Sequence, residues 1–249
     1  MNKRPYVLTI AGFDPSSGAG VTSDIKTFEQ HEVYGLSVVT AVTYQNESQF
    51  IGVKWLTFNE IESQLMALKH YKPQVIKIGL IESATVLSEV LDWIKRNWPE
   101  TYIIWDPILK ASAGFPFHKE LHKEIKALVS KRLDLLTPNL PEYTQLFGKE
   151  KAQVVADELH CSILVKGGHT TLNEVCDNLY TPHKTVFSVK SQKVEGDLQK
   201  HGTGCILSSV IAAELAKAAN LESACSKAHY YVKKMIGSNP TLLAYHQNI

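Results

Sequence analysis

Short apolar runs alternate with amphipathic stretches along most of this chain, and the alternation restricts the folds open to it. The apolar runs are rich in β-branched residues, which is typical of strands covered on both faces. They are Tyr6–Ala11, Leu36–Val42, Val75–Ile78, Tyr102–Trp105, Leu133–Leu136 and Ser162–Val165. Helical spacing of apolar residues marks Asn59–His70, Thr85–Trp98, Lys119–Lys131, Cys205–Ala218 and Leu221–Ile236. These strand–helix units predict an α/β fold with a doubly wound, mostly parallel sheet and helices on both faces.

Local signals add detail to this prediction. Asn59 and Glu62 have the spacing of a capping box at the start of a helix. Leu179–Tyr180 and Val186–Val189 flank a Pro-His-Lys-Thr segment and predict an antiparallel hairpin. No linker, low-complexity tract or internal repeat divides the 249 residues. We therefore expect a single domain over residues 1–249, since a chain of this length can bury a full core.

Charge and cysteine usage exclude several classes of protein. The formal net charge is +1, which gives no electrostatic reason to expect nucleic acid or an anionic membrane as a partner. The four cysteines are scattered, without the spacing of a metal site. The apolar run near the N-terminus is too short for a signal peptide, and no segment approaches a membrane span. The sequence predicts a reduced, cytoplasmic protein.

Polar or glycine-rich segments follow every predicted strand, which is where parallel sheets bind ligands. The first is the glycine-rich loop Gly12–Gly20, which leads into a helix carrying Asp24. The others begin at Tyr44, Gly79, Asp106, Thr137 and Lys166. The loop is not G-x-G-x-x-G, and no G-x-x-x-x-G-K-[ST] occurs, so a nicotinamide enzyme and a P-loop ATPase both lose support.

The segment His201–Cys205 reads His-Gly-Thr-Gly-Cys, directly before a predicted helix. Two glycines there permit a tight turn that exposes backbone N–H groups at the positive end of the helix. This arrangement favours a phosphate, or charge that develops on an oxygen. Cys205 would lie in the first turn, where the helix field favours its thiolate. The alternative is a glycine-rich turn followed by a buried cysteine.

Four ordered motifs identify a family. LTIAGFDPSSGAGVTSDIKTF, TPNLPE, LVKGGH and HGTGC closely resemble the hydroxymethylpyrimidine/phosphomethylpyrimidine kinases of thiamine biosynthesis, which belong to the ribokinase-like superfamily. The resemblance runs from about Leu8 to Lys234. It implies a ribokinase-like fold and ATP-dependent phosphorylation of 4-amino-5-hydroxymethyl-2-methylpyrimidine, then of its monophosphate to the diphosphate. It also implies Mg²⁺ and a homodimer.

The resemblance assigns substrate-binding roles to five residues. It implies that Asp24 and Gln45 hydrogen-bond the pyrimidine edge, while Gly12, Leu80 and Ile108 shape the pocket. A carboxylate paired with an amide can match an amine beside a ring acceptor. The alternative for Asp24 is a solvated residue in the first turn of a helix.

Other residues are assigned to the nucleotide and the metal. The resemblance implies that Asp106 and Lys166 lie near the phosphates and that Asn139 and Glu142 hold Mg²⁺, largely through water. Asn139 and Glu142 also have the pattern of a helix N-terminus with a capping box. Lys166 alone could be a solvated lysine at a strand end, and Asp106 a turn residue.

The fourth motif, His201–Cys205, is the one expected to catalyse the transfer. Its N–H groups at Gly202, Thr203, Gly204 and Cys205 can stabilise charge on the transferred phosphoryl group. Cys205 stands where many ribokinase-like enzymes place an Asp, and a lowered thiol pKa would let it act as the base. Of the ten histidines, His169 and His201 lie in motifs and are expected to organise backbone, and the other eight are expected on the surface.

The chain departs from the family pattern at several places. Lys110 stands two positions before the usual lysine of the segment that follows Asp106, and Gln199-Lys200 replaces Asn-Thr before the fourth motif. The glycine-rich C-terminal tail is replaced by Asn239–Leu243. Two other functions therefore stay open: a pyridoxal kinase of vitamin B6 salvage, and a non-catalytic pyrimidine-binding paralogue. Gln45 favours the pyrimidine, because pyridoxal-specific relatives tend to carry an apolar residue there.

Overall fold

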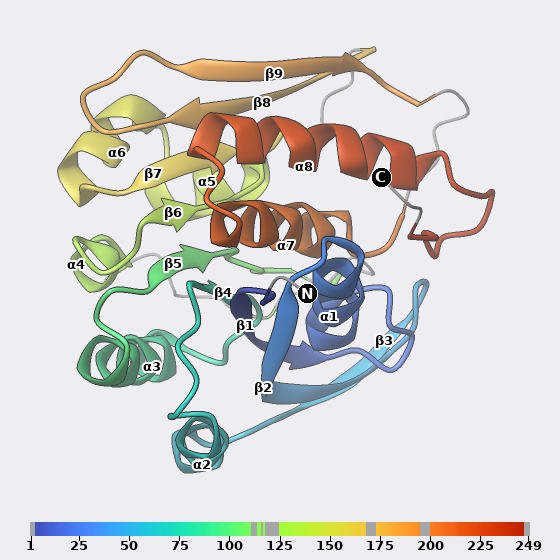
Figure 1. Cartoon of the computed structure of the whole chain (residues 1–249). Coiled ribbons are helices and arrows are strands. Elements are labelled where there is room, and N and C mark those ends of the chain that lie inside the picture. The colour runs from blue at the N-terminus through green and yellow to red at the C-terminus, as the bar shows by residue number, and fades with distance from the viewer. Residues whose placement is uncertain are drawn as a thin grey trace.

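The computed structural model describes residues 3–110, 114–115, 117, 125–167, 173–194 and 200–246. A nine-stranded sheet in the order β3-β2-β1-β4-β5-β6-β7-β8-β9 forms its centre (Figure 1). The strands are β1 (Tyr6–Phe13), β2 (Tyr34–Gln45), β3 (Phe50–Trp55), β4 (Val75–Ile78), β5 (Tyr102–Trp105), β6 (Leu135–Leu136), β7 (Ser162–Val165), β8 (Glu174–Tyr180) and β9 (Phe187–Gln192). The six neighbouring strands β2, β1, β4, β5, β6 and β7 are parallel to one another. At the two edges of the sheet, β3 pairs antiparallel with β2, β8 with β7 and β9 with β8.

Eight helices among the described residues cover the two faces of this sheet. They are α1 (Gly20–Gln30), α2 (Phe58–Ala67), α3 (Ala84–Asn97), α4 (Ile125–Val129), α5 (Leu140–Phe147), α6 (Ala152–Leu159), α7 (Thr203–Ala216) and α8 (Leu221–Ile236). One apolar core joins the sheet to α2–α6 and a second joins it to α1, α7 and α8. The predicted doubly wound α/β architecture is confirmed. No helix in the described part of the chain is long and apolar enough to cross a bilayer.

The six predicted strands and the hairpin are present, with different bounds. β2 extends to Gln45, and β6 is limited to two residues. Edge strand β3 and helix α6 were missed. β3 is half-exposed along its length, so it lacks the continuous apolar run by which buried strands are recognised. Of the predicted helix Lys119–Lys131, residues 119–124 lie outside the described residues.

The capping-box prediction was wrong by two positions. Thr57, not Asn59, is the N-cap of α2, and its side chain accepts from the backbone N–H of Glu60. Glu60 in return accepts from the backbone N–H of Thr57 at 2.7 Å. Thr57 with Glu60 and Asn59 with Glu62 have the same sequence spacing. The N-cap is the last extended residue before the helix, and in the structure that residue is Thr57.

Alternation along the central strands determines which side chains reach α7. In β4, Ile76 and Ile78 pack in the core on the α2–α6 side. Lys77 therefore points to the opposite face, because successive strand side chains alternate. That face is covered by α7, which is buried on all sides from Cys205 to Glu214. Polar side chains at this interface must find partners inside the protein.

Candidate active site

Two glycine-rich turns meet at the carboxyl edge of the sheet, one after β1 and one before α7. Gly202 is the N-cap of α7 with a φ of +80°, and a Cβ there would overlap the carbonyl oxygen of Gly18. Asp14 joins the turns: its carboxylate accepts from the N–H of Ala19 at 2.9 Å and from Nε2 of His201 at 2.7 Å. This bond confirms that His201 organises the turn. Asp14 was not predicted as a site residue, although an acid directly after the first predicted strand is a signal that the sequence contains.

The N-terminus of α7 presents the N–H groups that the sequence predicted. Gly202 has no side chain to cap Thr203, Gly204 and Cys205, and the first N–H groups of a helix have no partner within it. A Cβ on Gly204 would lie 3.2 Å from Nζ of Lys166. A phosphate at this helix end would therefore meet both the helix N-terminus and a lysine ammonium.

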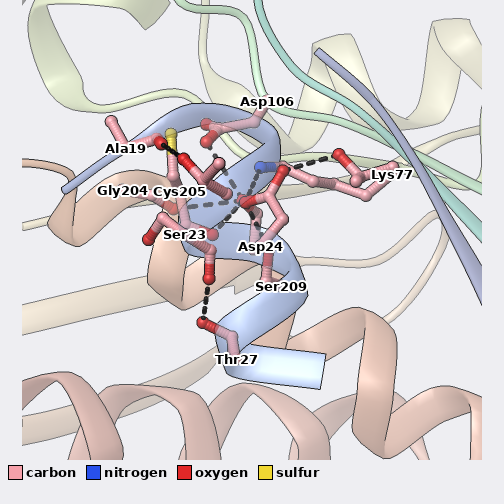
Figure 2. Close-up of polar contacts among 12 residues, drawn as sticks. Ala19, Ser23, Asp24, Thr27, Lys77, Asp106, Gly204, Cys205 and Ser209 are labelled. Carbon is pink, nitrogen blue, oxygen red and sulfur yellow. Dashed lines mark hydrogen bonds and ion pairs between the residues drawn. The ribbon is translucent and has the colours of Figure 1, made fainter. Parts of the chain in front are cut away.

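Cys205 is buried, and the expectation of a lowered thiol pKa was wrong. Its side chain lies near Asp24, Asp106 and Lys77 beside the turn after β1 (Figure 2). Burial raises the pKa of Cys205 to about 11, and the two carboxylates act in the same direction. Lys77 and the N–H of Gly20 oppose this rise in pKa without overcoming it. The free protein thus holds a neutral thiol at this position.

The protonated state of Cys205 gives a direct chemical test. Iodoacetamide at pH 8 is expected to label the half-buried Cys176 while leaving Cys205 unmodified in the folded protein, because the thiolate is the nucleophile. Peptide mass spectrometry before and after unfolding measures this difference. Rapid labelling of Cys205 in the folded protein would contradict the raised pKa.

Asp24 belongs to a closed ion-pair cluster (Figure 2). Its Oδ1 accepts from Nζ of Lys77 at 2.6 Å and from Oγ of Ser209 at 2.7 Å. Its Oδ2 accepts from the hydroxyl of Thr9 at 2.6 Å. Asp24 and Lys77 are both 0% exposed. The interpretation of Asp24 as a solvated helix residue is therefore wrong. One acceptor position on Oδ2 is left, but because Asp24 is 0% exposed, a direct bond to substrate would require its surroundings to open.

Asp106 and Lys166 form a second buried ion pair near the Asp24–Lys77 pair. Asp106 accepts from Nζ of Lys166 at 2.7 Å, from Thr137 at 3.1 Å and, through its other oxygen, from Ser208 at 3.1 Å. Consecutive serines of α7, Ser208 and Ser209, thus bind the two buried aspartates. Lys166 is therefore not the solvated lysine of the alternative interpretation. Asp106 does follow the end of β5, as the turn interpretation predicts, but its buried carboxylate binds Lys166.

Asn139 and Glu142 form the predicted capping box at the start of α5. The N–H of Glu142 donates to Oδ1 of Asn139 at 2.8 Å, and Oε2 of Glu142 accepts from the N–H of Asn139 at 2.7 Å. Burial raises the pKa of Glu142 to about 7, partly offset by Lys166 and reinforced by Asp106. No cluster of three His, Cys, Asp or Glu ligands exists in the described residues.

The residues expected around the pyrimidine lie along the same edge. A Cβ on Gly12 would meet the Leu80 side chain at 3.0 Å, and one on Gly79 would lie 3.8 Å from Ile108. Gln45 ends β2 and is half-buried. Within the described residues its side-chain amide forms no hydrogen bond. No described residue thus competes with a ligand for this amide, whereas the Asp24 carboxylate is 0% exposed and already accepts three hydrogen bonds.

Two of the sequence departures meet in space. Nζ of Lys200 donates to the carbonyl oxygens of Asn239, at 2.6 Å, and Thr241. The N–H of His201 donates to the Leu242 carbonyl at 2.8 Å. The unusual C-terminal segment is thereby bound to the turn before α7. Lys110 is exposed, and residues 111–113 and 168–172, including His169, lie outside the described residues.

An anion-binding helix N-terminus beside a buried lysine–carboxylate pair, at the carboxyl edge of a doubly wound sheet, is the arrangement of an α/β phosphotransferase. The chain belongs to the phosphomethylpyrimidine kinase family, whose model matches residues 14–249. A hydroxymethylpyrimidine/phosphomethylpyrimidine kinase of Haemophilus influenzae is 31% identical, over 95% of this chain and 92% of the relative. One of Saccharomyces cerevisiae is 33% identical over 94% of this chain. The chain spans about half of that yeast protein, 46% of its length.

Solved structures share the fold. Pyridoxal kinase from Staphylococcus aureus, in complex with AMP-PCP and pyridoxal, has a TM-score of 0.84 at 24% identity, covering 95% of this chain and 89% of the other. Phosphomethylpyrimidine kinase from Clostridium difficile has a TM-score of 0.77 at 28% identity, covering 94% of this chain and 100% of the other. The ribokinase-like fold predicted from the motifs is confirmed.

Proposed function

We propose that this protein transfers phosphoryl groups from ATP to 4-amino-5-hydroxymethyl-2-methylpyrimidine and then to its monophosphate. The observation that carries the proposal is the open N-terminus of α7 beside Lys166 and Asp106, with the Gln45 amide, which has no partner among the described residues, on the same edge. The names of the Haemophilus influenzae and yeast relatives support the same activity.

Backbone N–H groups and a lysine ammonium would both interact with the negative charge of the phosphates. The N–H groups of Gly202, Thr203 and Gly204 would stabilise the phosphoryl oxygens as charge shifts during transfer. Lys166, whose pKa is raised by the Asp106 and Glu142 carboxylates against the effect of burial, remains an ammonium and would approach the phosphates. The protein contributes mainly position and charge, because phosphoryl transfer has a loose transition state.

The donor set fits Mg²⁺ held partly by the nucleotide. Mg²⁺ favours one or two carboxylates together with substrate phosphates and water. Glu142 offers a carboxyl whose pKa of about 7 reflects burial, and Asn139 lies at the same helix start. Bound Mg²⁺ would neutralise developing phosphate charge. Asn139 and Glu142 would hold it, largely through water, while the capping box fixes their positions.

Substrate recognition is assigned first to Gln45. Its amide can pair with the aminopyrimidine edge, and Gly12, Leu80 and Ile108 would form the apolar surroundings. Asp24 would act on the pyrimidine by fixing Lys77 and α1, and would bond it directly only if the buried cluster opened.

The proton-accepting role of Cys205 would need its thiol pKa to fall from about 11 in the complex with both substrates. Cys205→Ala, which should spare pyrimidine binding, tests that role through the rate of transfer.

A product-resolved kinase assay tests the function. Purified protein with ATP and Mg²⁺ is given hydroxymethylpyrimidine, its monophosphate or pyridoxal, and the products are identified by mass. Turnover of both pyrimidines, with pyridoxal much slower, is expected. Preference for pyridoxal would favour vitamin B6 salvage, the alternative supported by the Staphylococcus aureus structure. Pyrimidine binding without turnover would identify a non-catalytic paralogue.

Gln45→Leu is expected to reduce kcat/KM for hydroxymethylpyrimidine by about 10²-fold or more, since a buried polar edge of the ligand loses its partner. The KM for ATP should stay unchanged, because the nucleotide phosphates are assigned to Lys166 and the N-terminus of α7 and not to Gln45. Steady-state kinetics with each substrate varied in turn measure both effects. Gln49→Leu, at an exposed position in the following turn, is the control. An equal loss in both variants would refute a specific role for Gln45.

Two further proposals rest on the resemblance alone. We propose a homodimer, which light scattering of the purified protein would test. The cytoplasmic location remains a prediction for cell fractionation.

A further inference from the structure

A chain of buried hydrogen bonds lies on the α8 side of the sheet edge, outside the predicted site. Nδ1 of His229, in α8, lies 2.7 Å from Oδ2 of Asp177, in β8. Nε2 of the same ring lies 2.8 Å from the hydroxyl of Ser191, in β9. His229 and Asp177 are 4% and 5% exposed. The histidine had been expected on the surface, so this cluster was missed in the sequence.

The Asp177 carboxylate determines which groups of the cluster donate hydrogen bonds to it. A carboxylate only accepts hydrogen bonds, so Nδ1 of His229 donates to Asp177, while Nε2 bonds the hydroxyl of Ser191. Asp177 uses its other oxygen, Oδ1, to accept from the backbone N–H of Gly167 at 2.8 Å. The cluster has the order Ser–His–Asp that hydrolytic triads also show. Through the N–H of Gly167, its carboxylate holds the backbone next to Lys166.

Gly167 directly follows the phosphate-facing lysine. The N–H of Lys166 donates to the Pro138 carbonyl at 2.9 Å, and the next N–H is held by Asp177. A Cβ on Gly167 would overlap the carbonyl oxygen of Cys176, so the backbone passes tightly against β8. The end of β7 is thus held on one side by the β6 loop and on the other by β8. Its position sets where the Lys166 side chain begins.

From these contacts we infer that His229 and Asp177 are positioning residues for Lys166: they fix the end of β7 so that the ammonium group lies between Asp106 and the N-terminus of α7. The inference rests on the proposed role of Lys166 at the nucleotide phosphates. Ser191 completes the bonding of the imidazole and keeps the ring from turning. Outer partners of this kind typically change ligand affinity by about 10- to 100-fold when removed.

Matched substitutions separate the two nitrogens of the ring. His229→Asn places an amide donor near the position of Nδ1 and should keep the bond to Asp177. His229→Gln reaches toward Ser191 and should lose it. We expect His229→Gln and Asp177→Asn to weaken ATP binding about tenfold, with His229→Asn close to the wild type. The KM for the pyrimidine should not change. Calorimetric titration with ATP and steady-state kinetics measure these values, and thermal melting confirms folding.

A double-mutant cycle with Lys166→Met decides whether the effect passes through the lysine. In the Lys166→Met background, His229→Gln should cause no further loss of ATP affinity. Equal losses in both backgrounds, or equal effects of His229→Asn and His229→Gln, would show a merely structural role and overturn the inference.

The cycle also separates this inference from the proposed site. If Lys166→Met itself leaves ATP binding unchanged, the assignment of Lys166 fails and the inference fails with it. If Lys166→Met weakens ATP binding while both His229→Gln and Asp177→Asn leave it intact, the site stands and the positioning role alone is wrong. If His229→Gln melts below the assay temperature, the result for Asp177→Asn decides the test, because that substitution only replaces one carboxylate oxygen by an NH2 group.

Discussion

Replacing Gly202 by alanine is expected to reduce kcat/KM by at least about 10²-fold, because a displacement of roughly 1 Å at a transfer site has that effect. The residue has a φ of +80°, which an L side chain rarely adopts, and its Cβ would overlap the Gly18 carbonyl oxygen. The turn before α7 must therefore move away from the turn after β1. Steady-state kinetics with both substrates measure the loss.

Gly148→Ala is the matched control for this substitution. Gly148 also has a positive φ, +66°, but a Cβ there would meet nothing within 4 Å. It follows α5, away from the N-terminus of α7. We expect a loss of stability of about 1–2 kcal/mol, from the left-handed backbone alone, and unchanged kinetics. Activity in Gly202→Ala equal to that of Gly148→Ala would show that contact between the two turns is not needed for transfer.

Lys77→Met is expected to destabilise the protein by about 3–5 kcal/mol, since it leaves the Asp24 carboxylate buried without a cation. Both groups are 0% exposed, so water cannot replace the lost partner. Asp24→Asn with Lys77→Met should recover most of the loss, because the amide still accepts from Thr9 or Ser209 without a net charge. Urea unfolding of the single and double variants measures the coupling. Additive losses would contradict a closed ion pair.

The pH dependence of this pair follows from the sign of the shift. Burial opposes the charge of Lys77, but the Asp24 carboxylate, supported by Asp106, outweighs burial and raises the lysine pKa above 10.5. A raised pKa in the folded state contributes stability that is fully present below 10.5 and is lost as the pH rises through the folded value. The difference in unfolding free energy between wild type and the double variant Asp24→Asn/Lys77→Met, which has no titratable group at either position, should therefore be constant from pH 6 to 9. A steady change over that range would contradict the assignment.

Much of the fold could be predicted because its signals are local. The runs that became β1, β4, β5 and β7 are predominantly apolar and buried along most of their length, as is typical of strands between two helix layers. β3 escaped prediction because an edge strand is half-exposed and carries no such run. The carboxyl edge could also be located, since each polar segment directly follows a recognisable strand.

The state of the site residues could not be predicted in the same way. Asp24 meets Lys77, 53 positions away, and Ser209, 185 positions away. Asp177 meets His229 across 52 positions. No periodicity within a window of sequence reports such pairs, and they decide whether a carboxylate is free for substrate or closed inside the protein.

Cys205 shows both contributions at one position. The sequence alone determined that a glycine turn precedes a helix there, because turns and helices depend on neighbouring residues. Only the tertiary structure decided its chemistry, since burial beneath the turn after β1, beside two carboxylates, raises the thiol pKa to about 11. Backbone form depends on adjacent residues, whereas the charge of a buried group depends on desolvation and on partners that folding brings together from distant parts of the chain.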